Sequence, residues 1–267
     1  MIRKEGTMGE QSELLCVIED YTGIITLNRP HVHNAISMNM RQLLGETLDE
    51  INTNDDVRVV ILTGSGKSFC SGVDLKERKD MSEKEVRQLR EKGPVNQMKI
   101  INLNKPVIAA MCGNALAGGF ELALACDLRI ASDDAMFGLP ETTLGIIPAG
   151  GGTQFLPRLV GDAQAREIIF TGRRIDAARA KEIGLVNYVV PRKEVMTKAK
   201  ELADAMKYQS PTALKNAKKA VNRSREIGLT EGFSFEAQAY LACIPTKDRV
   251  EALRAYAEKR KPVFTGE

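Results

Sequence analysis

Two glutamates follow tight turns in otherwise apolar surroundings. Glu121 ends the sequence GGFE at 118–121, and Glu141 ends GLPE at 138–141. Carboxylates are costly to bury unless they have a partner or a task, and glycines let backbone N–H groups approach a ligand closely. The pair is therefore a candidate acid/base site. Taken singly, each is about as consistent with a structural role, Glu121 in the first turn of a helix and Glu141 in a surface turn.

Backbone donors are expected beside these carboxylates. The turn before Glu121 leads into a predicted helix, whose unpaired N–H groups and positive dipole end face whatever lies in front. A second loop, at 68–74, follows its own buried strand in the same manner. If the two loops converge, the N–H groups of Val73 and Gly118 could hold a carbonyl oxygen, as an oxyanion hole for an enolate does.

Other kinds of site find less support. His31 and His33 are the only histidines; no further ligand cluster accompanies them, which favours solvated loop residues over a metal site and speaks against a Ser-His-Asp triad. The sequence GGG at 150–152 lacks the Gly-Lys-Ser/Thr ending of a phosphate loop, so a turn before a helix is favoured. No G-x-G-x-x-G follows a strand, which makes a dinucleotide site a weak hypothesis.

Charge and composition limit the partners. The 267 residues carry a net charge of +3 with a pI near 8.5, which suits an anionic small molecule and falls short of a nucleic-acid binder. One predicted helix does have a basic face, and a solvated surface is favoured there over contact with RNA or a membrane. That face is made by Lys215, Lys218, Lys219, Arg223 and Arg225.

The five cysteines indicate a reducing compartment. They are odd in number and widely spaced, without a C-x-x-C, and several lie in apolar patterns typical of buried thiols. No apolar stretch approaches the roughly 20 residues of a membrane span, and the first six residues do not resemble a signal or transit peptide. We therefore expect a cytoplasmic protein that does not bind a membrane.

Strands alternate with helices along most of the chain. A hairpin is predicted between 14 and 27, a helix from Met38 to Ile51 capped by Ser37, buried strands at 57–63, 107–111 and 128–131, a helical segment at 76–103 broken at Gly93, and a helix at 120–126. Such alternation indicates right-handed βαβ units. A short strand is expected at 186–190.

The chain divides into three parts that differ in predicted secondary structure. We expect a disordered tail at 1–12, an α/β core at 13–196 and a helical region at 197–267. The helical region is too thin to hold a core of its own. It is therefore expected to pack on the core or on another subunit.

From about residue 14 to 264 the chain resembles the enoyl-CoA hydratase/isomerase (crotonase) superfamily, and an enoyl-CoA hydratase most of all. The resemblance implies an α/β fold, the crotonase (ClpP-like) spiral of ββα units, with a C-terminal helical trimerisation region, assembled as a homo-trimer or a homo-hexamer made of two trimers. The sequence motifs that carry the resemblance are, in order, NRP at 28–30, NA at 34–35, FCSGVDL at 69–75, KPVIAA at 105–110, GGFELA at 118–123, CD at 126–127, FGLPE at 137–141, LGIIP at 144–148, GGGTQ at 150–154 and EKR at 258–260.

The resemblance also implies roles for the four candidate residues. Val73 and Gly118 match the positions that grip the thioester carbonyl of an acyl-CoA. Glu121 matches the glutamate that orients and deprotonates water, and Glu141 the one that delivers a proton to Cα. Retention of both glutamates favours reversible hydration of a 2-enoyl-CoA, with CoA as part of the substrate and no metal or redox cofactor. A role in fatty acid or other acyl-CoA degradation is implied.

Further substrate and CoA contacts are implied by position, the last three from an adjacent subunit: Arg29, Ala35, Ser71, Asp74, Leu75, Lys76, Gly119, Tyr240, Tyr256 and Lys259. Three residues depart from the family pattern. Ala117 replaces a frequent third glycine, which is tolerable if its φ is negative, Val73 replaces a common alanine, and His31 replaces a frequent lysine.

Two questions stay open at this level. The acyl pocket is expected to include residues of the 76–103 segment, namely Met81, Leu89 and Met98, together with Ile146 and Ile147. Another lyase or isomerase of the superfamily, acting on a branched or alicyclic acyl-CoA, is the alternative function. An RNA-binding side function through the basic helical face is the second alternative, and nucleic acid is the less expected partner.

Overall fold

A six-stranded sheet forms the centre of the molecule. The computed structural model describes residues 12–91 and 93–267, so nearly all of the expected tail at 1–12 lies outside the described residues. The strands run in the order β1 (Leu14–Glu19), β2 (Thr22–Leu27), β3 (Val59–Gly64), β5 (Val107–Met111), β7 (Leu128–Ser132) and β10 (Tyr188–Val190). Within this sheet, among the described residues, only the β1–β2 pair is antiparallel. Strands β3 and β5 are buried along their whole length, as their unbroken apolar sequences predict.

A smaller second sheet gives the fold its repeat. It contains β4 (Ser68–Cys70), β6 (Asn114–Leu116), β8 (Met136–Gly138) and β9 (Ile175–Asp176). Each of the pairs β3–β4, β5–β6 and β7–β8 places its first strand in the large sheet and its second in the small sheet. Helices α2 (Leu75–Lys79), α5 (Ala117–Ala125) and, after the short helix η2 (Pro140–Leu144), α6 (Gly152–Val160) follow these pairs. The predicted spiral of ββα units is confirmed.

Helices cover both faces of the large sheet. On one side lie α1 (Met38–Thr53) and α4 (Val95–Asn102), and Ser37 caps α1 by accepting a hydrogen bond of 2.9 Å from the Met40 N–H. On the other side α9 (Val195–Lys207) packs on apolar residues of β3, β5 and β7. The expected boundary at 197 thus falls inside a helix that packs on the sheet. The remaining elements of the body are η1 (Pro30–Val32), α3 (Glu83–Glu91), α7 (Asp162–Thr171), α8 (Ala177–Glu182) and η3 (Arg192–Glu194).

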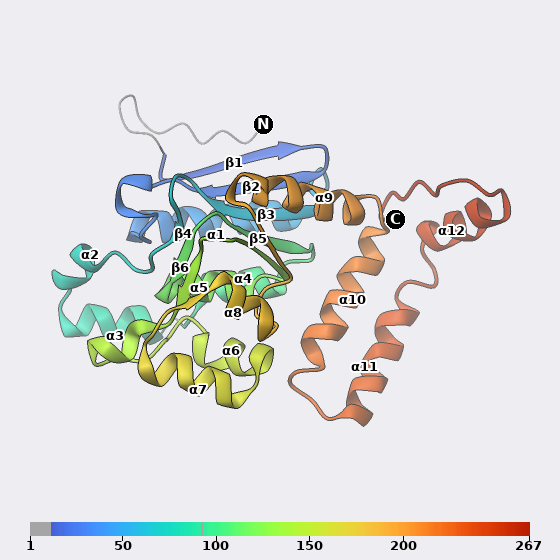
Figure 1. Cartoon of the computed structure of the whole chain (residues 1–267). Helices are drawn as coiled ribbons and strands as arrows, with labels where there is room; N and C mark the ends of the chain where they lie inside the picture. Colours follow the sequence, from blue (N-terminus) through green and yellow to red (C-terminus); the bar gives the residue numbers. More distant parts are fainter. Residues whose placement is uncertain (1–11, 92) are drawn as a thin grey trace.

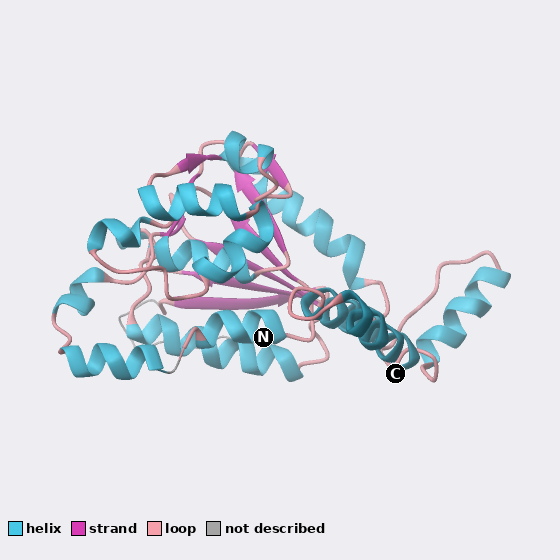
Figure 2. Ribbon diagram, turned by 90° about the horizontal axis from the view of Figure 1, so that it is seen from below, coloured by secondary structure: helices cyan, strands magenta, loops and turns pink. Residues whose placement is uncertain are grey.

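Three further helices extend away from this body (Figures 1 and 2). They are α10 (Pro211–Arg223), α11 (Leu229–Leu241) and α12 (Lys247–Ala257), so the all-helical end of the chain is as predicted. Helices α10 and α11 form an antiparallel hairpin, and α12 stands apart from it at the end of the chain. Among the described residues no helix is long and apolar enough to cross a membrane.

The cysteines are free thiols, as expected. Cys70 and Cys126 are buried, and burial raises the pKa of each thiol to about 12. Cys16, Cys112 and Cys243 are half-buried. Burial keeps the two core thiols protonated at neutral pH, which suits packing rather than nucleophilic chemistry.

One member of the expected basic face is not solvated. The Lys218 side chain is only 7% exposed, and its ammonium lies 2.8 Å from Oδ2 of Asp127. It also donates to the carbonyls of Ile100, at 3.1 Å, and Lys105, at 3.0 Å. The interpretation of Lys218 as a surface charge is therefore wrong, because this residue attaches α10 to the body. The basic face available to an RNA is smaller than the sequence suggested.

We expect Lys218→Met to lower the free energy of unfolding by about 2–3 kcal/mol, because it leaves the Asp127 carboxylate and two carbonyls without a buried cation. Urea unfolding at fixed protein concentration measures the change. Lys219→Met, on the exposed side of the same helix, is the matched control and should change stability by less than about 0.5 kcal/mol. Equal effects of the two substitutions would contradict the buried role of Lys218.

Candidate active site

Glu121 lies on α5 with its carboxylate held by backbone amides. The residue is 3% exposed. Its Oε1 accepts hydrogen bonds of 2.7 Å from the Gly150 N–H and 2.8 Å from the Gly152 N–H. Because α5 begins at Ala117, Glu121 is one turn inside the helix, not in its first turn. A dipole interaction at the helix start therefore does not account for this carboxylate.

The glycines at 150–152 are shaped around that carboxylate. A Cβ added at Gly150 would lie 2.3 Å from Oε2 of Glu121, closer than real Cβ contacts allow. Gly151 has a φ of +107°, which favours glycine, and it is the N-cap of α6. The predicted turn before a helix is confirmed. Its amides also position Glu121, a role that sequence reasoning missed.

Glu141 approaches from the short helix η2, which follows β8. It is 7% exposed. Pro140 is the first residue of η2, and its ring fixes φ in advance. Gly145, with a φ of +72°, ends the helix. Glu141 and Glu121 both line a cavity of about 750 Å³. The structure thus brings together the two carboxylates, which are 20 residues apart in the sequence.

The two predicted backbone donors lie side by side at this cavity. A Cβ added at Gly118 would lie 3.5 Å from Cγ2 and 3.8 Å from the backbone nitrogen of Val73. Gly118 is the second residue of α5, where helical N–H groups have no carbonyl partner within the helix. Val73 is fixed by its neighbours, since Ile36 N–H donates to the Gly72 carbonyl at 2.7 Å and Asp74 N–H to the Ile36 carbonyl at 3.0 Å. Both residues line the cavity.

Ala117 adopts the left-handed conformation at the start of α5. Its φ is +47°, so the condition of a negative φ, under which alanine is readily tolerated, is not met. A left-handed alanine costs about 1–2 kcal/mol. The turn in front of Gly118 therefore carries backbone strain, next to the predicted oxyanion donors.

Ala117→Gly should relieve this strain and raise the free energy of unfolding by up to about 1 kcal/mol, after allowance for the greater freedom of glycine in the unfolded chain. Chemical denaturation measures the change. Ala123→Gly, deep in the same helix, is the control and should lower stability, because no strained φ is relieved there. A loss of stability in Ala117→Gly as large as in the control would contradict strain at Ala117.

The α5 helix is also fixed at its other end. The buried Arg129 guanidinium donates to the carbonyls of Cys126, at 2.7 Å, and Ala123, at 3.4 Å, and to the Leu185 carbonyl at 2.8 Å. A cation is favourable at the carboxyl end of a helix. These bonds join α5 to the segment that leads into β10, so the helix that carries Glu121 is tied at both ends.

Five of the other predicted contact residues divide into two groups. Ala35, Ser71 and Leu75 line the cavity. Arg29 and Asp74 are not among its lining residues and pair with each other at 2.9 Å, and Asp74 also caps α2 by accepting from the Lys76 N–H. The Arg29 guanidinium holds the pKa of the Asp74 carboxyl below its usual value. This pair fixes the loops that surround the cavity.

The remaining predicted contacts lie away from the cavity lining. Gly119 packs against Cys70, where an added Cβ would lie 2.5 Å from the Cys70 Cβ. Lys76 is exposed on α2. Tyr240 and Tyr256 are 65% and 87% exposed on the projecting helices, and Lys259 follows α12. Within one chain, these last three residues are not brought to the site.

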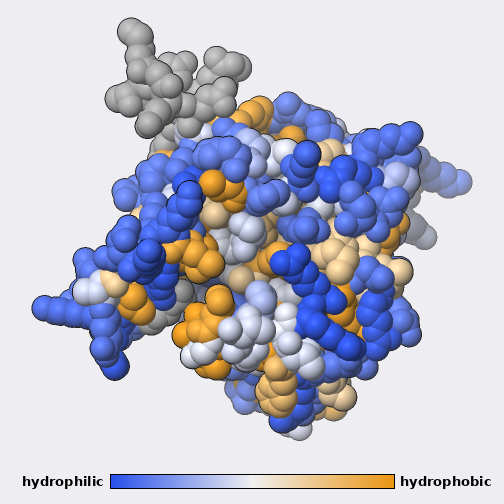
Figure 3. Space-filling view, turned by 60° about the vertical axis from the view of Figure 1, so that its left-hand side comes forward, coloured by the Kyte–Doolittle hydropathy of each residue, from blue (hydrophilic) through white to orange (hydrophobic). Residues whose placement is uncertain are grey.

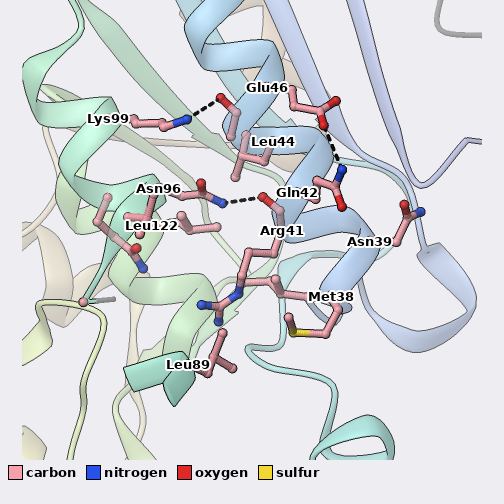
Figure 4. A pocket seen from close by; sticks show the side chains of 15 residues that line it. Met38, Asn39, Arg41, Gln42, Leu44, Glu46, Leu89, Asn96, Lys99 and Leu122 are labelled. Atoms are coloured by element: carbon pink, nitrogen blue, oxygen red, sulfur yellow. Dashed lines mark hydrogen bonds between the residues drawn. The ribbon is translucent and has the colours of Figure 1, made fainter. Parts of the chain in front are cut away.

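The acyl end of the cavity differs in part from expectation. Ile146 and Ile147 line it, but Met81, Leu89 and Met98 do not. Leu89 instead lines a second cavity of about 590 Å³ between α1 and α4 (Figure 4). The 76–103 segment contributes other residues, from helices α2, α3 and α4 and from the break between α3 and α4: Arg78, Val86, Gly93, Pro94 and Gln97.

Two arginines in the lining were missed altogether. Arg41 comes from α1 and Arg78 from α2, and both are half-buried. A helical pattern does not reveal in which direction a long charged side chain extends.

On the face that Figure 3 turns toward the viewer, hydrophobic side chains gather around a hollow among charged ones.

No cluster of three or more metal-ligating side chains occurs in the part of the chain that the structure describes. His33 is occupied otherwise, since its Nδ1 lies 3.0 Å from Oγ of Ser68. Asn34, beside it, donates to the carbonyls of Ser65 and Ser68, both at 2.8 Å. The segment that contains the two histidines therefore fixes the loop at 65–68, which precedes the cavity-lining residues Ser71 and Val73 in the sequence.

Comparisons with known proteins agree with this architecture, whose ββα spiral is the crotonase fold. Residues 19–267 match the enoyl-CoA hydratase/isomerase family, and the chain belongs to that family. A Bacillus subtilis protein named as an enoyl-CoA hydratase/isomerase is 49% identical, over 97% of this chain and all of its own length. Human mitochondrial methylglutaconyl-CoA hydratase is 42% identical, over 93% of this chain and 76% of its own. The crystal structure of an enoyl-CoA hydratase from Bacillus anthracis, 45% identical, superposes with a TM-score of 0.93 over 96% of this chain and all of that chain.

Proposed function

We propose that the protein is an enoyl-CoA hydratase, which adds water reversibly to the double bond of a 2-enoyl-CoA. The observation that carries the proposal is the cavity itself, where two buried carboxylates and two adjacent backbone donors meet. Membership of the enoyl-CoA hydratase/isomerase family supports it. A reaction that forms an enolate needs this combination of an acid, a base and an oxyanion hole.

In the proposed mechanism the thioester oxygen lies between the N–H groups of Val73 and Gly118. Glu121, held by the amides of Gly150 and Gly152, takes a proton from water, whose oxygen bonds to Cβ. Electrons of the double bond move to the thioester oxygen, and the two N–H groups stabilise the enolate charge. Glu141 then delivers a proton to Cα. A proton then passes from Glu121 to Glu141 through solvent, which restores both residues for the next turnover. One water is consumed and the thioester stays intact, so the balanced steps call for no redox cofactor.

The proposal extends to assembly as a trimer or a pair of trimers. Large hydrophobic side chains are exposed on the projecting helices, and such surfaces mark protein interfaces: Leu229, Phe233, Leu241, Val250 and Leu253. In an assembly, Tyr240, Tyr256 and Lys259 would be available to the CoA site of a neighbouring subunit. Sedimentation equilibrium tests the proposal, and a monomer at micromolar concentration would oppose it. We also propose a cytoplasmic location, because the five cysteines are free thiols, as is usual in a reducing compartment.

The activity is tested with crotonyl-CoA. We expect the absorbance of the enoyl thioester to fall and mass spectrometry to find a 3-hydroxyacyl-CoA heavier by one water. In D₂O the product should carry deuterium at Cα, delivered by Glu141. Migration of the double bond without a gain in mass would move the assignment to an isomerase of the same family.

A further inference from the structure

Asn34 has no step in the proposed mechanism, yet it is completely buried. Its exposed fraction is 0%, and its φ is +55°, in the left-handed region that asparagine adopts more readily than most residues. A buried amide is costly unless its donors and acceptors are bonded. The partners of this amide therefore show what the residue holds together.

The Asn34 side chain joins two separate stretches of the chain. Its Nδ2 donates to the carbonyls of Ser65 and Ser68, both at 2.8 Å, and to that of Phe69 at 3.2 Å. Its Oδ1 accepts a hydrogen bond of 2.9 Å from the Arg29 N–H. One end of the amide thus holds three carbonyls in and before β4, while the other end is fixed to the stretch that contains Asn34 itself.

Main-chain hydrogen bonds continue this junction as far as Val73. Ile36 pairs with Val73 as residues do in a parallel sheet. The Ile36 N–H donates to the Gly72 carbonyl at 2.7 Å, and the Ile36 carbonyl accepts from the Asp74 N–H at 3.0 Å. Along an extended chain the peptide groups of successive residues point to opposite edges. Since the bonded groups of Gly72 and Asp74 point toward Ile36, the N–H of Val73 points away from it.

The start of α5 lies close to Val73. A Cβ added at Gly118 would lie 3.8 Å from the Val73 nitrogen. Gly72 has a φ of +104°, and a Cβ added there would lie 3.3 Å from the Gly118 nitrogen and 2.8 Å from the Ala117 Cβ. We call residues 65–74 the oxyanion segment. With contacts this close, a small shift of that segment changes the position of one proposed donor relative to the other.

We propose, building on the hydratase function above, that Asn34 is a positioning residue of the oxyanion hole. Its amide fixes the oxyanion segment, and the pairing with Ile36 then aims the Val73 N–H at the thioester oxygen. The donor is thereby in place before the substrate binds, as a preorganised oxyanion hole requires. Because charge on that oxygen grows toward the enolate, a misplaced donor costs more in the transition state than in substrate binding.

Asn34→Gly tests the proposal, because glycine keeps the left-handed φ and removes the amide side chain. We expect kcat for hydration of crotonyl-CoA to fall about 10–100-fold, as for a group displaced by up to about 1 Å, and KM to change by less than about 3-fold. Asn222→Ala is the control, since this amide donates to the Ile101 carbonyl at 3.1 Å and joins α10 to the body. It should lower stability and leave kcat unchanged.

Infrared spectroscopy distinguishes positioning from a general loss of structure. Butyryl-CoA with a ¹³C-labelled thioester carbonyl should show a lower C=O stretching frequency when bound to the wild type, because two N–H donors polarise the carbonyl. Since Val73 supplies one of the two donors, Asn34→Gly should lose up to about half of this shift. Asn222→Ala should keep all of it.

A folded Asn34→Gly variant that keeps the full carbonyl shift would overturn the proposal, whatever its kcat. If that variant does not fold, Ser68→Ala decides, since it removes only the Oγ that lies 3.0 Å from Nδ1 of His33 at the same junction. A smaller carbonyl shift is expected there too, and an unchanged shift would overturn the proposal.

The hydratase function fails in a different way from the role of Asn34. A wild-type protein that shifts the carbonyl frequency but does not hydrate crotonyl-CoA would remove the hydratase function, and the infrared comparison of the variants would still decide the role of Asn34. A wild-type protein that hydrates crotonyl-CoA while Asn34→Gly leaves the carbonyl shift unchanged would keep the function and overturn only the positioning role.

Discussion

Glu121→Gln and Glu141→Gln are each expected to lower kcat for hydration of crotonyl-CoA by about 10²–10⁴-fold, the usual contribution of one acid/base group. The amide keeps the size of the carboxyl but can neither take the proton of water nor deliver one to Cα. Steady-state kinetics with purified protein measures the loss. The two carboxylates line the same cavity, and in the proposed mechanism each acts in a different proton transfer.

Binding provides the control for this prediction. Butyryl-CoA, a saturated analogue that cannot be hydrated, should bind both variants within a few-fold of the wild-type affinity in calorimetry, because the proposed thioester contacts are backbone groups. Glu201→Gln, an exposed residue of α9, should keep full activity. If both site variants kept wild-type hydration, the two-glutamate mechanism would be wrong.

Gly150→Ala should lower kcat by about 10²-fold or more. The added methyl group would lie 2.3 Å from Oε2 of Glu121 and 2.7 Å from Nε2 of Gln97, so the carboxylate must move. A displacement of about 1 Å in a catalytic group can reduce the rate by about this factor. The same kinetic assay measures the effect. Gly228→Ala is the control, since a Cβ there meets no atom within 4 Å and the φ is ordinary.

A double variant separates this effect from a general disturbance. If Gly150 acts through Glu121, then adding Gly150→Ala to Glu121→Gln should cost much less than it costs in the wild type, because groups that act as a unit are not additive. Fully additive losses would show that the methyl group acts by another route. Thermal unfolding of each variant shows whether the fold is kept.

Sequence patterns predicted those strands and helix ends that depend on residues close together in the sequence. Unbroken apolar runs predicted β3 and β5 because strands buried on both faces need apolar residues at every position. The Ser37 cap predicted the start of α1 correctly. The helix α5 begins at Ala117, earlier than the predicted residue 120, because packing against β4 overrides the low helix propensity of two glycines.

What the sequence could not show depends on contacts between distant segments. The amides of Gly150 and Gly152 bind a carboxylate about thirty residues away, and nothing in the GGG sequence specifies that partner. Lys218 resembles its solvated neighbours in sequence, yet its side chain enters a site made by residues around 100, 105 and 127. The family resemblance identified the glutamates, but only the fold shows what holds them in place.

Main-chain amides hold Oε1 of Glu121, and this has a consequence for how the site tolerates change. A backbone N–H does not titrate, so these two hydrogen bonds lose no donor as the pH changes, whereas a histidine donor would change its charge near neutral pH. No point substitution other than proline removes such a donor. Substitutions other than proline at Gly150 and Gly152 therefore act through shape, by added bulk, while the two N–H donors stay in place.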